Sequence, residues 1–335
     1  MRKKIMAVLM AAVMAFTMTA LTSCGNSEGG NQDFAWVLAT ASPEDTVTQI
    51  YAEKFAEEVN NLSNGEMRIQ VYSNSSLGGD TELLESCMNG DIPFVVQNTA
   101  PQVSYMPKLA IFDLPCVFED IDQLHEVMDN PQLMEKINKI YAEKGIKLLG
   151  MSDQDFRVMS SNKNVEKLGD FKGIKIRTME NSNHMAYWTA IGANPSPMAF
   201  AEVYIGLQQK TIDAQENPYE VIVSNKFYEQ QKYIIQTNHL PHLLSLVTNE
   251  EFLENLSPEQ QEIINQAAQT ACDVARQAAQ DRVADRIAIC EEGGSTIVPV
   301  SPELRAEMKD ASSKLYEDIR KIVDDDELYK IYIGE

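Results

Sequence analysis

The sequence predicts an α/β protein with two lobes, a cleft between them and one long bracing helix. Two β-α-β patterns follow each other along the chain, between residues 35 and 98 and between residues 155 and 218. Such patterns are typical of sheets whose parallel strands are joined by crossover helices. The chain has 335 residues, more than a single core usually holds, so two units are expected.

Hydrophobic periodicity and turn residues define the first pattern. It predicts strands at 35–40, 67–73 and 92–98, with an amphipathic helix over 46–65 and a short helix over 81–90. A helical segment over 131–144 and a strand at 146–150 follow. The second pattern predicts strands at 155–161, 173–179 and 211–218, with helices over 182–192 and 200–210.

The segment from Ser257 to Gly293 predicts the bracing helix. Ser257 is an N-cap, Pro258 occupies the first helical position, Gln260 completes a capping box, and no breaker follows before Gly293. One face is rich in alanine and is expected to pack across both lobes. A coiled-coil seam is the alternative, but alanines and isolated isoleucines do not form a sustained heptad pattern.

The N-terminus predicts export and lipid attachment. Basic residues, an apolar stretch and small residues before Cys24 indicate a lipoprotein signal peptide over 1–23, followed by a flexible tether over 24–33. Cys24 is then the lipidated residue, and the protein is anchored outside the cell membrane. An ordinary secretory signal with an incidental cysteine is the alternative. No other apolar run approaches the ~18 residues that a membrane helix needs.

The net charge argues against a nucleic-acid partner. The formal charge is −22, and it becomes −25 when the basic residues of the signal peptide are removed. There is no basic stripe that could neutralise phosphates. An acidic protein that binds an anion must do so with a few basic groups placed locally.

The remaining cysteines and histidines give no metal signature, and no cofactor is expected. Cys87, Cys116, Cys272 and Cys290 show no zinc-like spacing and are expected to be buried free thiols, with a Cys87–Cys116 disulfide as the alternative. In the HLPH segment (239–242) the proline prevents a helical pair of metal ligands, so a polar loop is expected there. The sequence also lacks the common enzyme motifs for hydrolysis, phosphate binding and dinucleotide binding.

Three polar residues stand where predicted strands end: Arg157, Arg177 and Asn217. Ligands of open α/β sheets bind beyond the carboxyl ends of the strands. A guanidinium matches a carboxylate in a bidentate geometry, and the helix that starts near Asn181 also favours an anion. Taken alone, Arg177 is as compatible with a structural salt bridge as with a ligand contact.

Several long motifs resemble one protein family. The segment KGIKIRTMENSNHMAYWTAIGANPSPMAFAEVYIGLQQKTIDAQENP, with SSLGGDTELLESCMNGDI upstream, resembles solute-binding proteins of tripartite ATP-independent periplasmic (TRAP) transporters of the DctP type. The resemblance runs from about Phe34 to about Ile322. It implies a two-lobed periplasmic-binding-protein-like fold that captures an organic acid for the membrane subunits of a TRAP transporter, and no enzymatic activity.

The resemblance also implies roles for individual residues. Arg177 corresponds to the family's selectivity arginine, which pairs with the ligand carboxylate, and Arg157 to a second arginine. Asn217 corresponds to the asparagine that bonds the same carboxylate, and Phe200 to an aromatic residue that lines the cleft. Asp80 and Asn98 lie where relatives make polar ligand contacts.

The lobes are expected to be discontinuous in sequence. We expect lobe I to comprise 34–154 and about 243–282, and lobe II 155–242 and about 283–330. A receptor of an ATP-driven importer and an anchored hydrolase remain as alternative functions.

The identity of the acid stays open at this point. A sugar acid such as a uronate is favoured over a four-carbon dicarboxylate. The reasons are the resemblance of RTMEN to the R-x-M-x-N run of uronate-binding relatives and several polar side chains suited to hydroxyl groups: Glu44, Asp80, Asn98, Gln154 and Gln215.

Overall fold

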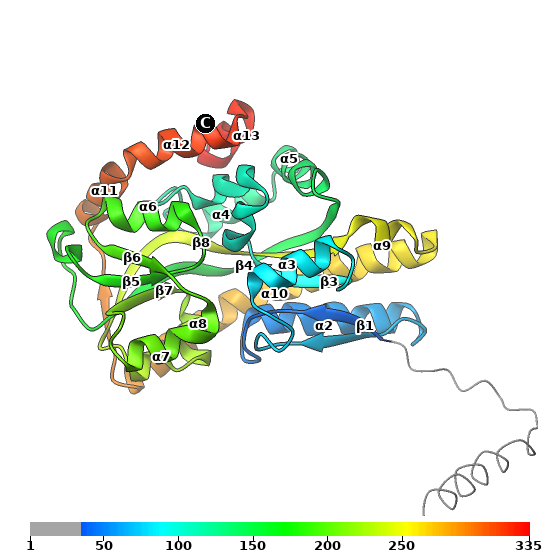
Figure 1. The fold of residues 1–335 in the computed structure, drawn as a ribbon, viewed down its shortest axis with the longest axis horizontal. Helices are drawn as coiled ribbons and strands as arrows, with labels where there is room; N and C mark the ends of the chain where they lie inside the picture. Colours follow the sequence, from blue (N-terminus) through cyan, green and yellow to red (C-terminus); the bar gives the residue numbers. More distant parts are fainter. Residues whose placement is uncertain (1–34) are drawn as a thin grey trace, which may run out of the picture. The chain divides into compact units, whose positions relative to one another are not determined.

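The computed structural model describes residues 35–335, in which nine strands form one mixed sheet flanked by helices (Figure 1). The predicted signal peptide, tether and Cys24 lie outside the described residues. The strand order is β2-β1-β3-β8-β4-β7-β5-β6, and β9 pairs with β8. The strands are β1 Trp36–Ala39, β2 Ile69–Tyr72, β3 Phe94–Asn98, β4 Ile146–Ser161, β5 Lys175–Thr178, β6 Asn194–Pro197, β7 Ala214–Asn217, β8 Tyr233–Asn249 and β9 Thr296–Pro299.

Helices cover both faces of this sheet, and 3-10 helices form several of the connections (Figure 1). The α-helices are α2 Val47–Leu62, α3 Asp80–Met88, α4 Ile121–Met128, α5 Pro131–Ala142, α6 Ser182–Ala190, α7 Val203–Gln208, α8 Tyr219–Ser224, α9 Glu250–Glu254, α10 Pro258–Glu292, α11 Pro302–Ala311, α12 Ser313–Val323 and α13 Asp326–Ile333. The 3-10 helices are η1 Ala100–Ser104, η2 Pro107–Asp113, η3 Leu168–Phe171, η4 Phe200–Glu202 and η5 Phe227–Glu229.

The two predicted β-α-β patterns are confirmed, one in each half of the sheet. In the first half β1 pairs in parallel with β2 and β3, and α2 and α3 make the crossovers. In the second half β5 pairs in parallel with β6 and β7. The expected single helix over 200–210 is divided into η4 and α7.

Two long antiparallel strands join the halves, and the sequence did not predict them as such. The expected separate strands at 146–150 and 155–161 are one strand, β4, which pairs with β8 along most of its length. The register shifts between Asp153 and Phe156, where Asp155 has a φ of 66°. An irregularity of this kind interrupts the side-chain alternation, which explains why the periodicity suggested two strands.

The predicted polar loop at 239–242 is wrong, because this segment lies inside β8. His239 and His242 are buried, and Pro241 pairs with Phe156 next to the register shift. A proline has no N–H to donate, and a bulge is one of the few places where a strand tolerates it. Within the described residues no group of histidine, cysteine and acidic side chains is arranged to hold a metal ion.

Helix α10 begins and ends as predicted. Ser257 Oγ accepts from Gln260 N at 3.2 Å, Gln260 Oε1 accepts from Ser257 N at 2.9 Å, and Gly293 is the C-cap. The helix packs on α2, β4, α8 and β9, so it contacts both halves of the sheet, as expected. Its buried alanine face packs on β4 at Gly150, where a Cβ would lie 3.6 Å from Cys272 Cβ and 3.7 Å from Ala268 O.

Two further predictions concern the cysteines and membrane-spanning helices. Cys87, Cys116, Cys272 and Cys290 are buried free thiols, as expected, and the alternative disulfide does not form. Among residues 35–335 no helix has both the length and the apolar character needed to cross a bilayer.

Two arginines of α10 join segments that are distant in sequence. Arg282 and Arg286 both donate to Asp45, which precedes α2, at 2.6 and 2.7 Å. Both also donate to Glu220 of α8, at 2.7 and 2.8 Å. Burial raises the pKa of Glu220 to about 7, although the charge and hydrogen bond of Arg286 lower it. The buried carboxylate therefore depends on its arginine partners.

We predict that Arg286→Met lowers the free energy of unfolding by about 1.5–3 kcal/mol, the typical contribution of a hydrogen bond to a charged group. The control is Arg276→Met on the same helix, because Arg276 pairs with Asp129, whose side chain is 60% exposed. Exposed pairs contribute less than about 1 kcal/mol. Urea unfolding of both variants is the measurement, and equal losses would contradict the prediction.

Candidate functional site

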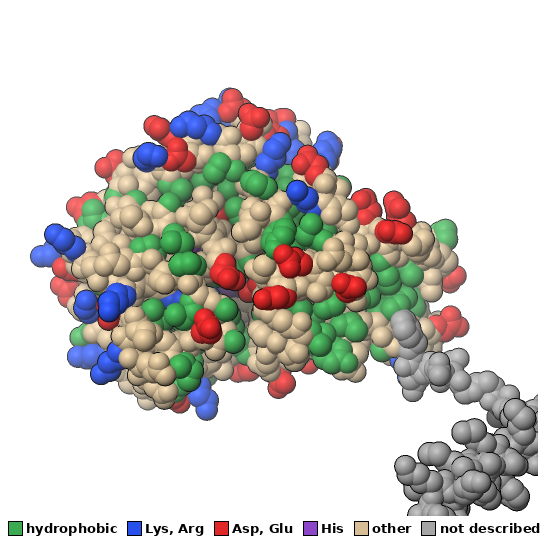
Figure 2. Space-filling view, viewed as in Figure 1, with side chains coloured by type: hydrophobic (Ala, Val, Ile, Leu, Met, Phe, Trp, Pro, Cys, Tyr) green, Lys and Arg blue, Asp and Glu red, His purple; other side chains and the backbone are tan. Residues whose placement is uncertain are grey.

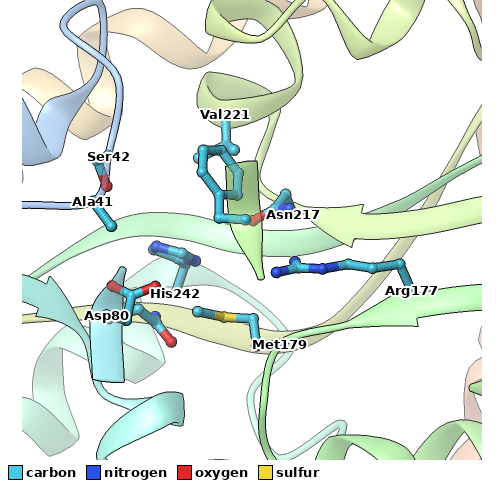
Figure 3. A pocket seen from close by; sticks show the side chains of 10 residues that line it. Ala41, Ser42, Asp80, Arg177, Met179, Asn217, Val221 and His242 are labelled. Atoms are coloured by element: carbon cyan, nitrogen blue, oxygen red, sulfur yellow. The ribbon is translucent and has the colours of Figure 1, made fainter. Parts of the chain in front are cut away.

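A cavity lies where the carboxyl ends of β5 and β7 face the N-terminus of α3 (Figure 3). It encloses about 360 Å³ of empty space, part of which is open to solvent. Its lining residues are Ala41, Ser42, Asp80, Asn98, Arg177, Met179, Phe200, Asn217, Val221 and His242. Five of the six predicted ligand residues are among them, and Arg157 is not.

Arg177 provides a cation with one free donor group. Its Nε and Nη2 atoms donate to Met198 O at 2.9 and 2.6 Å, which fixes the guanidinium plane. Its Nη1 atom is buried and has no hydrogen-bond partner within the described residues. Burial lowers the pKa of Arg177 to about 10, although Glu216 opposes this, so the side chain stays charged at neutral pH. Figure 3 shows the guanidinium reaching into the cavity from β5.

Asn217 and Asn98 are held in the cavity wall by hydrogen bonds to the protein. Asn217 Oδ1 accepts from Arg157 at 3.1 Å, and its Nδ2 donates to Gln215 at 2.6 Å. Asn98 Oδ1 accepts from Ala100 N at 2.9 Å, and its Nδ2 donates to Leu243 O at 2.9 Å. Each amide nitrogen keeps a second hydrogen, so both side chains retain a donor.

Asp80 faces Arg177 from the opposite side of the cavity (Figure 3). It is the first residue of α3, after the N-cap Gly79. Burial raises the pKa of Asp80 to about 6, although Arg177 counteracts the shift. The cavity therefore has a cation at one side and a carboxylate at the other.

Phe200 contributes the aromatic side of the cavity, as predicted. It begins η4 and packs edge-on against Phe227, with ring centroids 6.2 Å apart. It also lines a wider neighbouring hollow of about 720 Å³ together with Asp80, Arg177 and Met179. This hollow is continuous in its lining with the cavity and forms its approach.

Arg157 lies behind the cavity wall, where its donors are taken by the protein. Its Nε and Nη2 atoms bind the Glu216 carboxylate, Nη2 at 2.9 Å, and Nη2 also donates to Asn217. Its Nη1 atom donates to His242 Nδ1. Arg157 is thus placed to position Asn217 and His242, which do line the cavity.

Comparisons with known proteins identify the family of this chain. The family described as "Bacterial extracellular solute-binding protein, family 7" matches residues 38–322. The C4-dicarboxylate-binding periplasmic protein DctP of Vibrio cholerae is 31% identical over 280 residues, which cover 81% of this chain and 82% of the relative.

Two solved structures are also similar. The sugar acid binding protein DctPAm of Advenella mimigardefordensis, in complex with galactonate, has a TM-score of 0.85 and 28% identity and covers 90% of this chain and 97% of that one. A TRAP periplasmic solute-binding protein of a Sulfitobacter species with bound β-D-galacturonate has a TM-score of 0.85 and 27% identity, covering 90% of this chain and 100% of that one.

The chain belongs to the TRAP solute-binding protein family. It has the two-lobed periplasmic-binding fold of this family and is an extracytoplasmic transport protein, not an enzyme. The alternatives of an anchored hydrolase and of a receptor for an ATP-driven importer are therefore set aside.

In this TRAP solute-binding protein a buried charge network supports the cavity from behind. Glu216 is fully buried and binds Arg157 and, at 3.2 Å, His239 Nε2. Burial opposes its charge, but Arg157 and the histidines hold the pKa of Glu216 well below its usual range. His184 connects this carboxylate to Asp113 of η2, at 3.7 Å from Glu216 and 3.2 Å from Asp113.

His242 is one of the cavity-lining residues that the sequence did not predict. Burial and Arg157 lower its pKa well below the usual range, so the ring is neutral. Its Nδ1 atom accepts a hydrogen bond from Arg157 Nη1, so the hydrogen of the neutral ring is on Nε2, which can act as a donor. The HLPH segment gave a signal, but it was interpreted as a loop. Ala41, Ser42, Met179 and Val221 were missed as well.

The expected role of the α6 N-terminus in anion binding is wrong. Asn181 Oδ1 accepts from the backbone N–H groups of Asn183 and His184 at 2.7 and 3.1 Å. Asn181 Nδ2 donates to Asp113 and to Ala100 O, both at 2.9 Å. The helix end is therefore satisfied by its own N-cap side chain and does not line the cavity.

Three of the polar side chains proposed for hydroxyl groups lie elsewhere. Glu44 is exposed, Gln154 donates to Thr48 at 2.7 Å, and Gln215 donates to Ser160 at 2.7 Å. Asp80 and Asn98 are the two of that set that line the cavity.

The charge network predicts a loss of stability at alkaline pH. Burial lowers the pKa of His184, but Asp113 and Glu216 outweigh it and raise the value to about 9. A histidine that binds its proton more tightly in the folded state stabilises the fold fully below its ordinary pKa of about 6.5, and this stabilisation is lost as the pH rises through about 9. The melting temperature should therefore fall between pH 7 and pH 10.

His184→Gln should lower the melting temperature at pH 7 and flatten its fall towards pH 10. Lysines and tyrosines titrate in both proteins, so the difference between the two pH profiles isolates His184. Thermal unfolding monitored by circular dichroism is the measurement. Parallel profiles for parent and variant would show that His184 does not carry the alkaline loss.

Proposed function

We propose that this protein captures an organic acid by its carboxylate and delivers it to the membrane subunits of a TRAP transporter. A sugar acid such as a uronate or an aldonate is favoured over a four-carbon dicarboxylate. The observation that carries the proposal is the buried Nη1 atom of Arg177, a cationic donor without a partner among the described residues in a cavity at the strand ends.

The free-energy cost of burying the Arg177 Nη1 donor without a partner supports a ligand at this position. A buried polar group that lacks a partner loses its hydration without compensation, and the cost is larger for a charged group. A ligand carboxylate placed at Nη1 restores both the hydrogen bond and the charge balance. The Nδ2 group of Asn217 is a second donor in the same wall, and Phe200 supplies an apolar face.

The polarity of the cavity supports a hydroxylated acid. Beyond the carboxylate position the wall offers Ser42, Asp80, Asn98 and His242, which include donors and acceptors for hydroxyl groups. The galactonate and galacturonate complexes of similar proteins are consistent with this class of ligand.

We further propose that the lobes divide where the two long strands are irregular. Lobe I would comprise 34–154 and about 243–282, and lobe II 155–242 and about 283–330. The register shift after Asp153 and the positive φ of Asp155 support a boundary in β4 at this point. The cavity would then lie between the lobes, since it is lined by Asp80 and Asn98 from one and by Arg177 and Asn217 from the other.

The ligand is identified by a thermal-shift screen of the purified protein against organic acids, because a ligand that binds only the folded state raises the melting temperature. Hexuronates and hexonates should give the largest shifts. Larger shifts from succinate and malate would favour the dicarboxylate alternative, which the Vibrio cholerae relative represents.

Arg177→Ala should weaken binding of the selected acid at least about tenfold, because truncating one partner of a buried charged pair costs about 2–5 kcal/mol. Arg177→Lys should bind measurably less tightly than the parent, since it keeps the charge but loses the rigid guanidinium that the two bonds to Met198 O hold in place. Lys175→Ala is the matched control, because Lys175 lies on the same strand and is exposed. Calorimetric titration is the measurement, and parent-like affinity of Arg177→Ala would rule out the proposed contact.

Attachment to the cell membrane through Cys24 is proposed from the sequence alone. Two acyl chains on this cysteine are sufficient for stable anchoring. Cys24→Ser should therefore be released into the medium or remain unprocessed. Fractionation and mass determination provide the test, and a variant that stays membrane-bound at the normal mature mass would disprove lipidation.

A further inference from the structure

The cavity that holds Arg177 also holds an acidic side chain without a partner. Asp80 lines it from the first position of α3, and within residues 35–335 its carboxylate makes no hydrogen bond or salt bridge. It faces Arg177 across the space, and both side chains point into it (Figure 3). The ionised Asp80 carboxylate can only accept hydrogen bonds, because it has no hydrogen to donate.

The approach to the cavity adds further negative charge. Glu82 and Glu180 line the wider hollow together with Asp80 and Arg177. Thr81 Oγ1 donates to Glu180 Oε2 at 3.5 Å, so the start of α3 and the segment after β5 lie next to each other. Figure 2 shows acidic side chains gathered around α3 near the middle of this face, whereas most lysines and arginines lie towards its edges.

Among residues 35–335, no second cation lines the cavity for another ligand carboxylate. Of the lining residues, only Arg177 and His242 are basic, and His242 is neutral. The donors of Arg157 are taken by Glu216, Asn217 and His242. A second carboxylate at the far end of the ligand would therefore meet Asp80 without compensation.

We infer that Asp80 makes the receptor selective for monocarboxylates that carry a hydroxyl group at the end opposite the carboxylate. The Asp80 carboxylate accepts the hydrogen of that hydroxyl and repels a carboxylate in the same place. Discrimination of this kind comes from an unfavourable contact with the wrong ligand as well as from a favourable contact with the right one. The inference rests on the proposed function, which assigns the ligand carboxylate to Arg177.

The ionisation of Asp80 is consistent with this role at neutral pH. The charged groups that face it are Arg177 of β5, Arg157 of β4, Glu180 after β5 and Glu82 on its own helix. Burial raises its pKa to about 6, so the group is mostly ionised at pH 8 and mostly protonated at pH 5. The preference against a second carboxylate should therefore weaken as the pH falls below about 6.

Two matched pairs of acids test the inference in calorimetric titrations of the full chain at pH 8. D-Galactonate and D-galactarate share a carbon chain and differ only in a terminal hydroxymethyl or carboxylate group. 4-Hydroxybutyrate and succinate form the shorter pair. For the parent we expect the hydroxy monoacid of at least one pair to bind at least about tenfold more tightly than its diacid.

Asp80→Asn removes the charge and keeps the shape of the side chain. It should reduce the ratio of the two affinities at least about tenfold, through weaker binding of the monoacid, tighter binding of the diacid, or both. Glu82→Gln is the control, because Glu82 lines the approach but not the cavity, and its ratio should stay within about threefold of the parent. Melting temperatures confirm that both variants are folded.

The outcomes separate the inference from the function on which it rests. A parent that prefers the diacids, or an Asp80→Asn variant with an unchanged ratio, overturns the role of Asp80 and leaves a receptor for organic acids. An equal loss of discrimination in Glu82→Gln would assign the effect to the overall negative potential of the approach. This outcome also overturns the role of Asp80. No binding of any of the four acids, together with no thermal shift from any hexuronate, overturns the proposed sugar-acid function itself.

Discussion

The buried pair of Arg157 and Glu216 is the interaction on which the rest of the site depends. Arg157 lies on β4 and Glu216 on β7, and both side chains are almost completely inaccessible to solvent. Breaking a buried pair by removing one partner is costly, because the other charge is left without compensation. This requirement fixes the register of two strands and, through Asn217 and His242, the back wall of the cavity.

The same pair explains why Arg177 is available. Among the carboxylates, Glu216 has the largest effect on the pKa of Arg177, but its oxygens are occupied by Arg157 and His239. Arg177 is instead oriented by a backbone carbonyl, which satisfies two donors without cancelling the charge. The Arg177 guanidinium is desolvated, is held rigid and lacks a partner for Nη1 within the described residues, so it is preorganised for binding an anion.

The chain is strongly acidic, yet a cation lines the cavity. Charges at the surface, which contribute to the formal charge of −22, are screened by solvent and salt. Inside the cavity the interactions are short and poorly screened, so in the proposed function the Arg177 guanidinium would hold the ligand carboxylate. The acidic approach would then limit how many negative charges a bound molecule carries.

The sequence by itself determined the local elements and the members of the site that belong to long motifs. The caps of α10, the crossover pattern of each half and the position of Arg177 at a strand end follow from spacing, turn residues and motif resemblance over neighbouring positions. Asn217, Phe200 and Asp80 were predicted in the same way, and the cavity brings them together.

Only the tertiary structure decided which polar groups are free. Pairing between β4 and β8 joins residues far apart in sequence, so neither their continuity nor the burial of His242 could be inferred from periodicity. The donors of Arg157 are directed to Glu216, and the α6 N-terminus is capped by Asn181. Whether a donor serves the fold or a ligand depends on its neighbours in space, and a linear pattern does not specify them.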